Sequence, residues 1–358
     1  MKVLHIADVH LTSRLDRSAR EAERADHLLA RLSDAVAAGA ELVLIAGDLF
    51  ETPFESETLT NRVFSALGAL LVPVCLIAGN HDCACAGSSY RKASFPENVH
   101  FLDESNPTFE TDAVTVYGIS FTAPFEPRRM LSDYSVKDPQ KLNILLFHGD
   151  LASESEYMPF TPKELADTGA DYVALGHIHK RTEPKTEGKT TYAYAGIPDG
   201  RGFDELGEQG GWMLNLEKGK CTYEFFPMWG RQYIEQTVDL EGLTHTAACV
   251  DKIRATLSGR TEDAYKLRLR GRVLFPLSVT SIVKQLSDLY CVRCIDECNQ
   301  EDPTQDFDDY SLVGLFAKMA DEKIASATDE TTKKTYAMAR QFGLSALLEQ
   351  PMKGVDEE

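Results

Sequence analysis

Short apolar runs alternate with helical patterns along the first part of the chain. The runs Val3–Ala7, Leu42–Ala46 and Val74–Ala78 are short and mainly apolar, which is typical of buried strands. Between them, apolar residues recur at helical spacing, first up to Gly39 and then over Leu59–Leu71. This β-α-β-α-β order predicts neighbouring parallel strands that are joined by right-handed crossovers.

Shorter apolar runs follow, and they lie closer together in the sequence. We expect strands over Val114–Ile119, Leu142–Phe147, Tyr172–Leu175, Thr190–Tyr194, Gly211–Leu216 and Cys221–Phe226. The last two flank Glu217-Lys218-Gly219-Lys220, whose glycine indicates a hairpin turn. The pattern predicts an α/β domain over residues 1–229, in which one sheet or two packed sheets are flanked by helices.

The pattern changes near residue 230. Strands and helices then alternate over Tyr233–Val238, Ala247–Leu257, Tyr265–Leu274, Val279–Leu289 and Tyr290–Ile295. This order predicts a small α+β domain over residues 230–300. Residues 301–358 are expected to form an acidic linker and a helical tail, with helices over Leu312–Ala325 and Glu330–Leu348.

The charge balance limits the classes of partner. The chain of 358 residues holds 37 Lys and Arg against 56 Asp and Glu, a net charge of −19, which argues against a wholly basic nucleic-acid coat. It does not exclude nucleic acid, because bound metal ions or one local basic face can supply positive charge. No apolar run reaches the roughly 18 residues that span a bilayer. We expect a cytoplasmic protein without membrane contact, with its cysteines reduced.

Polar motifs follow five of the predicted strands. They are Asp8-Val9-His10, Gly47-Asp48, Gly79-Asn80-His81-Asp82, His148-Gly149 and Gly176-His177-Ile178-His179. Ligands of α/β sheets bind beyond the carboxyl ends of the strands, so we expect these side chains to share one edge. Carboxylates, an amide and imidazoles suit Mn, Fe or Zn. The alternative to a metal site is that these residues are buried core histidines and turn glycines. That alternative explains any one motif more easily than five motifs that each follow a strand.

The same motifs carry a resemblance to a known family. In Ala7-Asp8-Val9-His10-Leu11, Gly47-Asp48-Leu49-Phe50 and Gly79-Asn80-His81-Asp82 the chain resembles the calcineurin-like metallophosphoesterase superfamily. Within it, the chain looks most like the SbcD-type DNA repair exonucleases of the short Firmicutes type. The likeness is increased by the small α+β domain expected over residues 230–300, which would cap the catalytic domain. Ser311-Leu312-Val313-Gly314-Leu315-Phe316 at the start of the tail adds to it. Tyr194-Ala195-Gly196-Ile197 departs from the family's Tyr-Pro-Gly-Ser.

The resemblance implies a β-sandwich flanked by helices with a two-metal site, most naturally for Mn²⁺. One ion would bind Asp8, His10 and His179, the other Asn80, His148 and His177, and Asp48 would bridge the two. His81 would not be a ligand but would donate a proton to the leaving oxygen or stabilise charge in the transition state. Asp82 would orient the His81 ring.

The resemblance also implies partners. SbcD-type proteins act with a coiled-coil SbcC-type ATPase, and this chain has no GxxxxGK[ST] motif of its own. The C-terminal helices would dock on that ATPase, DNA ends would be the substrate, and helices of the catalytic domain would form a homodimer.

A basic strand face lies in the second domain. Residues 230–300 hold ten basic and nine acidic residues. Within them, Lys266, Arg268, Arg270 and Arg272 alternate with apolar residues, so they share one face of a strand. The face is either a solvated strand surface or a contact to the phosphate backbone of DNA.

Together these features predict a metal-dependent DNA phosphodiesterase, an exonuclease or endonuclease subunit that processes DNA ends in repair by hydroxide attack at two metals. The alternative is a nucleotide or small-molecule phosphodiesterase of the same superfamily. A scaffold for an ATPase with a vestigial site is a third hypothesis. A protein phosphatase is disfavoured, because Gly-Asp-x-His-Gly and Asp-Arg-Gly are missing. Cys83 and Cys85, next to the Asn80-His81-Asp82 turn, are either loop residues, oxidation-sensitive thiols or extra metal ligands.

Overall fold

The computed structural model describes residues 1–13, 18–132, 134–257, 259–273, 275, 277–300 and 311–347. Residues 301–310, which include most of the predicted acidic linker, and Leu348 in the predicted second tail helix lie outside these residues. The internal contacts divide the chain into two units, Met1–Ile234 and Glu235–Glu358. Each unit is described by itself.

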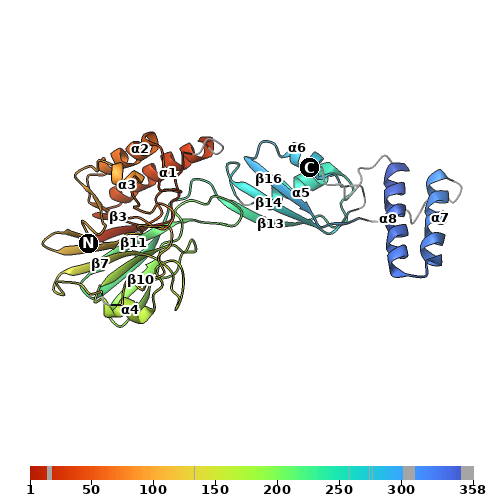
Figure 1. Ribbon diagram of the computed structural model, residues 1–358. Helices are drawn as coiled ribbons and strands as arrows, with labels where there is room; N and C mark the ends of the chain where they lie inside the picture. The colour runs from red at the N-terminus through yellow and green to blue at the C-terminus, as the bar shows by residue number, and fades with distance from the viewer. Residues whose placement is uncertain are drawn as a thin grey trace. The chain divides into compact units, whose positions relative to one another are not determined.

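Two six-stranded sheets form the first unit (Figure 1). The first has the order β12-β11-β1-β2-β3-β4, with β1 (Lys2–Ile6), β2 (Leu42–Ala46), β3 (Val74–Ile77), β4 (Val99–Phe101), β11 (Gly210–Glu217) and β12 (Lys220–Pro227). The second has the order β5-β6-β7-β8-β10-β9, with β5 (Thr108–Glu110), β6 (Val114–Ile119), β7 (Leu142–His148), β8 (Tyr172–Gly176), β9 (Lys185–Glu187) and β10 (Thr190–Tyr194). The pairs within β1 to β4 are parallel, as are those within β6 to β8.

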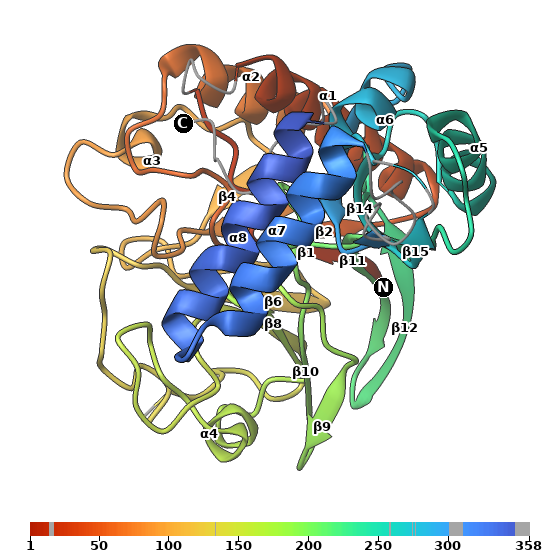
Figure 2. The same ribbon diagram turned by 90° about the vertical axis from the view of Figure 1, so that its right-hand side faces the viewer.

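The main core lies where the two sheets face each other. Leu44 of β2 and Ile77 of β3 belong to one buried cluster with Ile144 and Leu146 of β7. Helices α1 (Ser18–Ala37), α2 (Glu57–Gly68) and α3 (Ser89–Lys92) lie on one side of the sheets, and α4 (Pro162–Asp167) lies on the opposite side (Figures 1 and 2). The predicted α/β sandwich flanked by helices is therefore confirmed.

The second unit holds a small α+β fold. Its elements are β13 (Tyr233–Asp239), α5 (Thr246–Thr256), β14 (Ala264–Arg270), β15 (Arg272–Val273), α6 (Val279–Gln285), β16 (Cys291–Asp296) and β17 (Asn299–Gln300). They form a sheet of order β13-β14-β16 and a separate β15-β17 pair. The predicted single strand over Tyr265–Leu274 is interrupted at Gly271, whose φ of +101° breaks the extended backbone.

Two antiparallel helices, α7 (Leu312–Ser326) and α8 (Glu330–Leu347), pack against each other and form the helical tail (Figure 2). The Ser311 hydroxyl accepts a hydrogen bond from Gly314 N at 3.0 Å, and the Asp329 carboxylate, just before α8, accepts one from Thr332 N at 2.8 Å. Arg340 of α8 pairs with Asp321 of α7 at 2.7 Å. None of the described helices is both long and apolar enough to cross a membrane.

Candidate metal centre

Parallel strands bring the five motifs to one edge of the sandwich. The motif residues follow β1, β2, β3, β7 and β8, with His148 as the last residue of β7. Three groups place one potential ligand atom per residue within 4.8 Å of the others: Asp8, His10 and His179; Asp8, Asp48 and His148; and His10, Asp48 and His81. The edge predicted from the sequence is thus a single cluster of nitrogen and oxygen atoms.

The backbone at this edge is strained. Six non-glycine residues have positive φ in the described part of the chain, and four of them are candidate ligands: Asp8 (53°), His10 (54°), Asp48 (52°) and His177 (101°). Such conformations cost about 1–3 kcal/mol each and persist where surrounding structure enforces them. Here Asp8 N donates to Gly47 O at 3.1 Å, and His10 N donates to Asp48 O at 2.9 Å. The pairing of β1 with β2 therefore continues into the motifs and fixes them.

Glycines make room for the cluster. A Cβ at Gly47 would lie 2.8 Å from Cγ of His148, and one at Gly79 would lie 2.7 Å from Cγ of Asp48. Two different reasons explain the glycines at 47, 79 and 176, namely a sharp backbone turn and the close approach of neighbouring atoms. The sharp turn applies to Gly47, whose φ is +91°, whereas at Gly79 and Gly176 the close approach of neighbouring atoms is the reason.

Three of the four candidate histidine ligands are each anchored through one ring nitrogen. His10 Nδ1 lies 3.0 Å from Glu51, and His179 Nδ1 lies 3.0 Å from Glu205. His148 Nδ1 lies 2.9 Å from the Ala46 carbonyl oxygen. Carboxylates and carbonyls in these positions orient the imidazole rings and favour the tautomer whose other nitrogen can bind a metal ion.

The remaining nitrogens face the cluster. His148 Nε2 and His177 Nδ1 lie 3.0 and 3.1 Å from the Asn80 side-chain oxygen, while His177 Nε2 lies 3.3 Å from Asp150. His10 Nε2 lies 3.1 Å from His179 Nε2. Two imidazole nitrogens at this separation either share a proton or bind a common cation. The donor set therefore fits a divalent ion bound to these rings.

Burial and charge favour a cation in the same place. Asp8, Asp48 and His148 are at most 2% exposed. Burial raises the pKa of Asp8 to about 6. Burial opposes ionisation of Asp48 as well, but the adjacent His148 brings the pKa of that carboxyl below its usual range. Burial alone would lower the pKa of His148, yet Asp48 and Asp8 raise it to about 9. The buried carboxylates thus attract positive charge, which metal ions supply.

The family match agrees with this chemistry. A family model for the calcineurin-like phosphoesterases matches residues 1–181, which carry all five motifs. The chain belongs to this family. It is a family of phosphoesterases, which are hydrolases, and its members bind two divalent metal ions.

Curated relatives of this calcineurin-like phosphoesterase are distant. It is 27% identical over 243 residues to the uncharacterized metallophosphoesterase YhaO of Bacillus subtilis. This alignment covers 64% of this chain and 57% of that protein. It is 27% identical over 208 residues to the DNA double-strand break repair protein Mre11 of Sulfurisphaera tokodaii, which covers 55% of this chain and 54% of that protein. The chain spans little more than half the length of these relatives. A crystal structure aligns with 63% of this chain at 15% identity and a TM-score of 0.41, which is too low to carry an argument.

His81 and Asp82 lie on opposite sides of their turn. His81 is exposed, its backbone N–H donates to Asp48 at 2.9 Å, and its ring meets the His10 ring edge-on at 4.7 Å. Asp82 is 1% exposed and accepts hydrogen bonds from Gly79 N, Phe50 N and the Tyr90 hydroxyl at 2.7, 3.0 and 2.6 Å. The Asp82 carboxylate therefore holds the turn in the phosphoesterase core. The prediction that it orients the His81 ring is corrected.

One chain of ion pairs links the outer sides of two histidines, and the sequence did not reveal it. Arg201 NH1 lies 3.2 Å from Glu51, and Arg201 NH2 lies 3.0 Å from Glu205. These are the carboxylates that anchor His10 and His179. We call Glu51, Arg201 and Glu205 the Arg201 bridge. Its only sequence signal is that Arg201 lies in the segment after Gly196, where the chain departs from the family pattern.

Buried Arg24 supports the first motif from behind. It is 3% exposed, and its guanidinium donates to the Val9 carbonyl oxygen at 2.7 Å. Arg24 also lies 3.7 Å from Asp199. A hollow of about 430 Å³ opens beside His179 and Glu205 and is lined by charged residues of both signs, including Arg181 and Glu208. The phosphoesterase site is therefore open to solvent on this side.

Cys83 follows the Asp82 turn and is fully buried. Burial, together with neighbouring Cys85, raises the pKa of the Cys83 thiol to about 12. A thiol with so high a pKa is rarely ionised, and thiolates are the reactive and metal-binding form. Of the three interpretations of this pair, buried loop residues fit Cys83 best.

The basic face of the second unit is paired with acids. Tyr265, Leu267 and Leu269 of β14 are buried, as the alternation predicts. Lys266 lies 3.2 Å from Glu235, Arg268 pairs with Glu235 and Glu297, Arg270 lies 2.7 Å from Glu297, and Arg272 N donates to Glu241 at 2.6 Å. The arrangement is an ion-pair ladder across the sheet, which lowers the positive potential that phosphates would meet.

Proposed function

We propose that this chain is a Mn²⁺-dependent DNA phosphodiesterase of the SbcD type that processes DNA ends. The observation that carries the proposal is the close approach of His10 and His179, whose Nε2 atoms face each other at 3.1 Å beside buried carboxylates. Similarity to Mre11, a DNA double-strand break repair protein, supports DNA as the substrate.

In this proposal the chain holds two ions. Asp8, His10 and His179 bind one ion and Asn80, His148 and His177 bind the other. Asp48 would bridge the two ions. Its position supports this role, because its carboxylate lies 3.7 Å from His10 Nε2 and 3.4 Å from His148 Nε2, and these two histidines belong to different ligand sets. When bound, two such ions supply Lewis acidity that activates water and neutralises charge on the phosphate.

His81 is the proposed proton donor to the leaving oxygen. Its exposure and its place beside His10 put the ring at the mouth of the cluster. The anchored rings hold their inward nitrogens in fixed tautomers, so the chain's own part is to position ligands and to move one proton at His81.

A nucleotide or small-molecule phosphodiesterase is the second candidate. The ion-pair ladder favours it, because Glu235 and Glu297 already compensate the cations that were expected to meet DNA. The domain assignment belongs to the main proposal: residues 1–229 are catalytic, residues 230–300 cap and position DNA, and residues 301–358 dock a partner.

The partners are likewise proposed. α7 exposes Leu312, Leu315 and Met319 at 71%, 48% and 67%, which is the apolar spacing of a helix that docks into a groove. A coiled-coil SbcC-type ATPase is the proposed occupant, in a cytoplasmic complex. A homodimer through helices of the catalytic domain is the proposed assembly.

One assay tests substrate class. The purified full chain is incubated with Mn²⁺ and, in parallel, a blunt linear duplex, a cyclic nucleotide and bis-p-nitrophenyl phosphate. We expect nucleotide release from the duplex at a rate that Asp48→Asn abolishes. Hydrolysis of the nucleotide without any attack on the duplex would establish the second candidate. No hydrolysis of any diester, with metal bound, would favour the scaffold hypothesis.

A further inference from the structure

Aromatic rings extend outward from one side of the metal cluster. The Tyr157 ring lies 4.8 Å from the His177 ring at an interplanar angle of 37°. The Phe125 ring lies 5.8 Å from Tyr157 at 39°. Phe125 is 58% exposed, although it follows the buried strand β6 by only a few residues. A path of rings thus leads from a candidate metal ligand to solvent.

Backbone pairing holds this pair of rings in place. Glu126 N donates to Glu156 O at 2.7 Å, and Met158 N donates to Glu126 O at 2.6 Å. These two bonds tie the residue after Phe125 to both neighbours of Tyr157. Met158 is 1% exposed and belongs to the core on the outer side of the second sheet. The exposed Phe125 ring therefore stands on an ordered, core-anchored segment.

The two sides of the cluster differ in character. The side of His10 and His179 carries the charged Arg201 bridge. The side of His177 carries Phe125, Tyr157 and Leu151. Leu151 is 41% exposed, and it follows Asp150, whose carboxylate lies beside His177 Nε2. Within the described part of the chain, a phosphodiester bound at the cluster would therefore meet exposed aromatic and apolar side chains on the side of His177.

We propose that Phe125, supported by Tyr157, is a stacking subsite for the base of the nucleotide whose phosphodiester is cleaved. The inference rests on the proposed phosphodiesterase function and deepens it by assigning the side chains that receive the base. Every base has a π face, so stacking on one ring accepts any of the four bases and reads no sequence. The one-sided placement orients the strand across the cluster.

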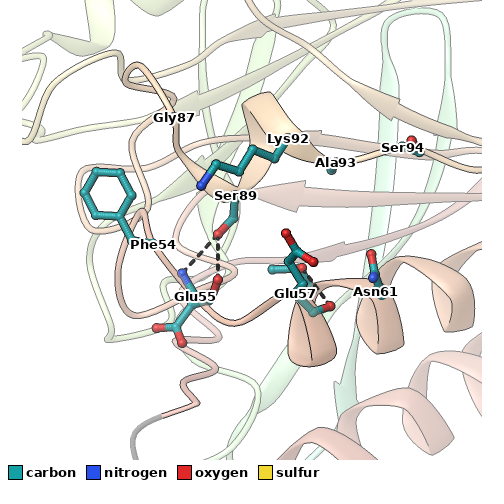
Figure 3. A pocket seen from close by; sticks show the side chains of 10 residues that line it. Phe54, Glu55, Glu57, Asn61, Gly87, Ser89, Lys92, Ala93 and Ser94 are labelled. Atoms are coloured by element: carbon teal, nitrogen blue, oxygen red, sulfur yellow. Dashed lines mark hydrogen bonds between the residues drawn. The ribbon is translucent and has the colours of Figure 1, made fainter.

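The substitutions Phe125→Ala and Phe125→Trp test the subsite, with Phe54→Ala as the matched control. Phe54 is 65% exposed and belongs to a different loop, where it lines a separate cavity of about 290 Å³ with Glu55, Glu57 and Lys92 (Figure 3). The substrates are two oligonucleotides that differ only in an abasic residue at the cleaved position. We expect Phe125→Ala to lower kcat/KM about 10- to 100-fold on the normal strand, the range of one lost base stack, and Phe125→Trp to restore it. On the abasic strand, Phe125→Ala should match the wild type.

A second readout does not need turnover. Tryptophan fluorescence of the Phe125→Trp variant should be quenched by the normal oligonucleotide and not by one that is abasic throughout, whereas a Phe54→Trp variant should respond to neither. Equal losses on the normal and abasic strands would make Phe125 a structural residue and overturn the inference. Equal losses in Phe125→Ala and Phe54→Ala would also overturn it. A wild type that cleaves the normal strand no faster than Phe125→Ala does would overturn the subsite alone. A wild type that cleaves no base-bearing diester would overturn the proposed function as well.

Discussion

Nε2 of His10 lies 3.1 Å from Nε2 of His179, and the outer nitrogen of each ring contacts a glutamate. These residues are 169 positions apart and follow strands of different sheets. Their close approach is produced by the backbone at the strand ends, by glycines that admit it, and by the Arg201 bridge behind them. The relationship makes the two imidazoles a preorganised pair that a cation completes.

Arg201→Ala should weaken the binding of one metal ion and spare the other. Without the guanidinium, Glu51 and Glu205 repel each other and no longer hold the outer nitrogens of His10 and His179. Loss of such supporting contacts typically costs 10–100-fold in metal affinity. Titration calorimetry with Mn²⁺ should show one of two sites weakened by about that factor. Arg128→Ala, which removes an exposed arginine paired with Glu126, is the control. Equal weakening of both sites would contradict a local role for the bridge.

Asp48→Asn should abolish hydrolysis without unfolding the chain. An amide tolerates the positive φ at this position, but it cannot neutralise charge between two cations. Turnover of bis-p-nitrophenyl phosphate should fall by several orders of magnitude, while circular dichroism stays that of the wild type. Retention of more than a tenth of the wild-type turnover would show that the two-metal proposal is wrong.

The sandwich was predictable because its signals are local. Leu42–Ala46, Val114–Ile119 and Thr190–Tyr194 have the predicted bounds, since an uninterrupted apolar run between turn residues limits a buried strand at both ends. The three-residue strands β4, β5 and β9 were missed, because so few residues carry no periodicity. The strand predicted over Tyr265–Leu274 is interrupted at Gly271 and forms β14 and β15 instead. The sequence did not predict this interruption, because polar and apolar residues alternate on both sides of Gly271.

The location of the candidate metal ligands was predictable from the sequence, whereas several of their side-chain contacts were not. Strand-end motifs brought the candidate ligands to one edge, because parallel strands end together. The direction of the Asp82 side chain was not predictable, since its partners are the backbone of Phe50 and the Tyr90 hydroxyl rather than its neighbour in the motif. The Arg201 bridge joins residues 150 positions apart, and no local spacing encodes such a contact.

His81→Ala should separate proton transfer from metal binding. As a proton donor outside the ligand set, His81 should leave metal content unchanged, and its loss should lower turnover by roughly 10²–10⁴, the usual contribution of general acid–base catalysis. Metal analysis of the purified variant and initial rates measure the two effects. His245→Ala, which removes an exposed histidine of the second unit, should change neither. Because His81 is also within ligand reach of His10 and Asp48, loss of a metal ion would identify it as a ligand instead.

The double substitution Arg268→Gln and Arg270→Gln tests the cap. Glutamine is chosen because a glutamate would face Glu297 and disturb the ladder. If these cations contact DNA, duplex affinity should fall and the slope of log affinity against log salt should flatten by about one unit per lost phosphate contact. Hydrolysis of bis-p-nitrophenyl phosphate should be unchanged. Arg254→Gln, which breaks an exposed pair with Asp288, is the control. A similar loss on both substrates would assign the ladder to cap stability.

The helical tail gives the last prediction. Four apolar residues recur at helical spacing on α7 and divide into two groups. Phe316 packs against Gly343 of α8, where a Cβ would lie 2.5 Å from Cε1 of the Phe316 ring, whereas Leu312, Leu315 and Met319 are exposed. Fold-back onto the catalytic domain is the alternative use of that surface. Deleting residues from Asp309 onward should leave Mn²⁺-dependent cleavage of small diesters intact and end co-purification of a coiled-coil ATPase.

The full-length variant with Leu312, Leu315 and Met319 replaced by Gln is the sharper form of this test. It keeps the contact of Phe316 with Gly343 and the pair of Arg340 with Asp321, so α7 and α8 should still form. Loss of the ATPase from this variant, with an unchanged melting temperature, would identify the exposed face as the docking surface, because apolar anchors at helical spacing supply the affinity of such contacts. If the ATPase still binds, or if the truncated chain unfolds, the tail belongs to the chain's own fold.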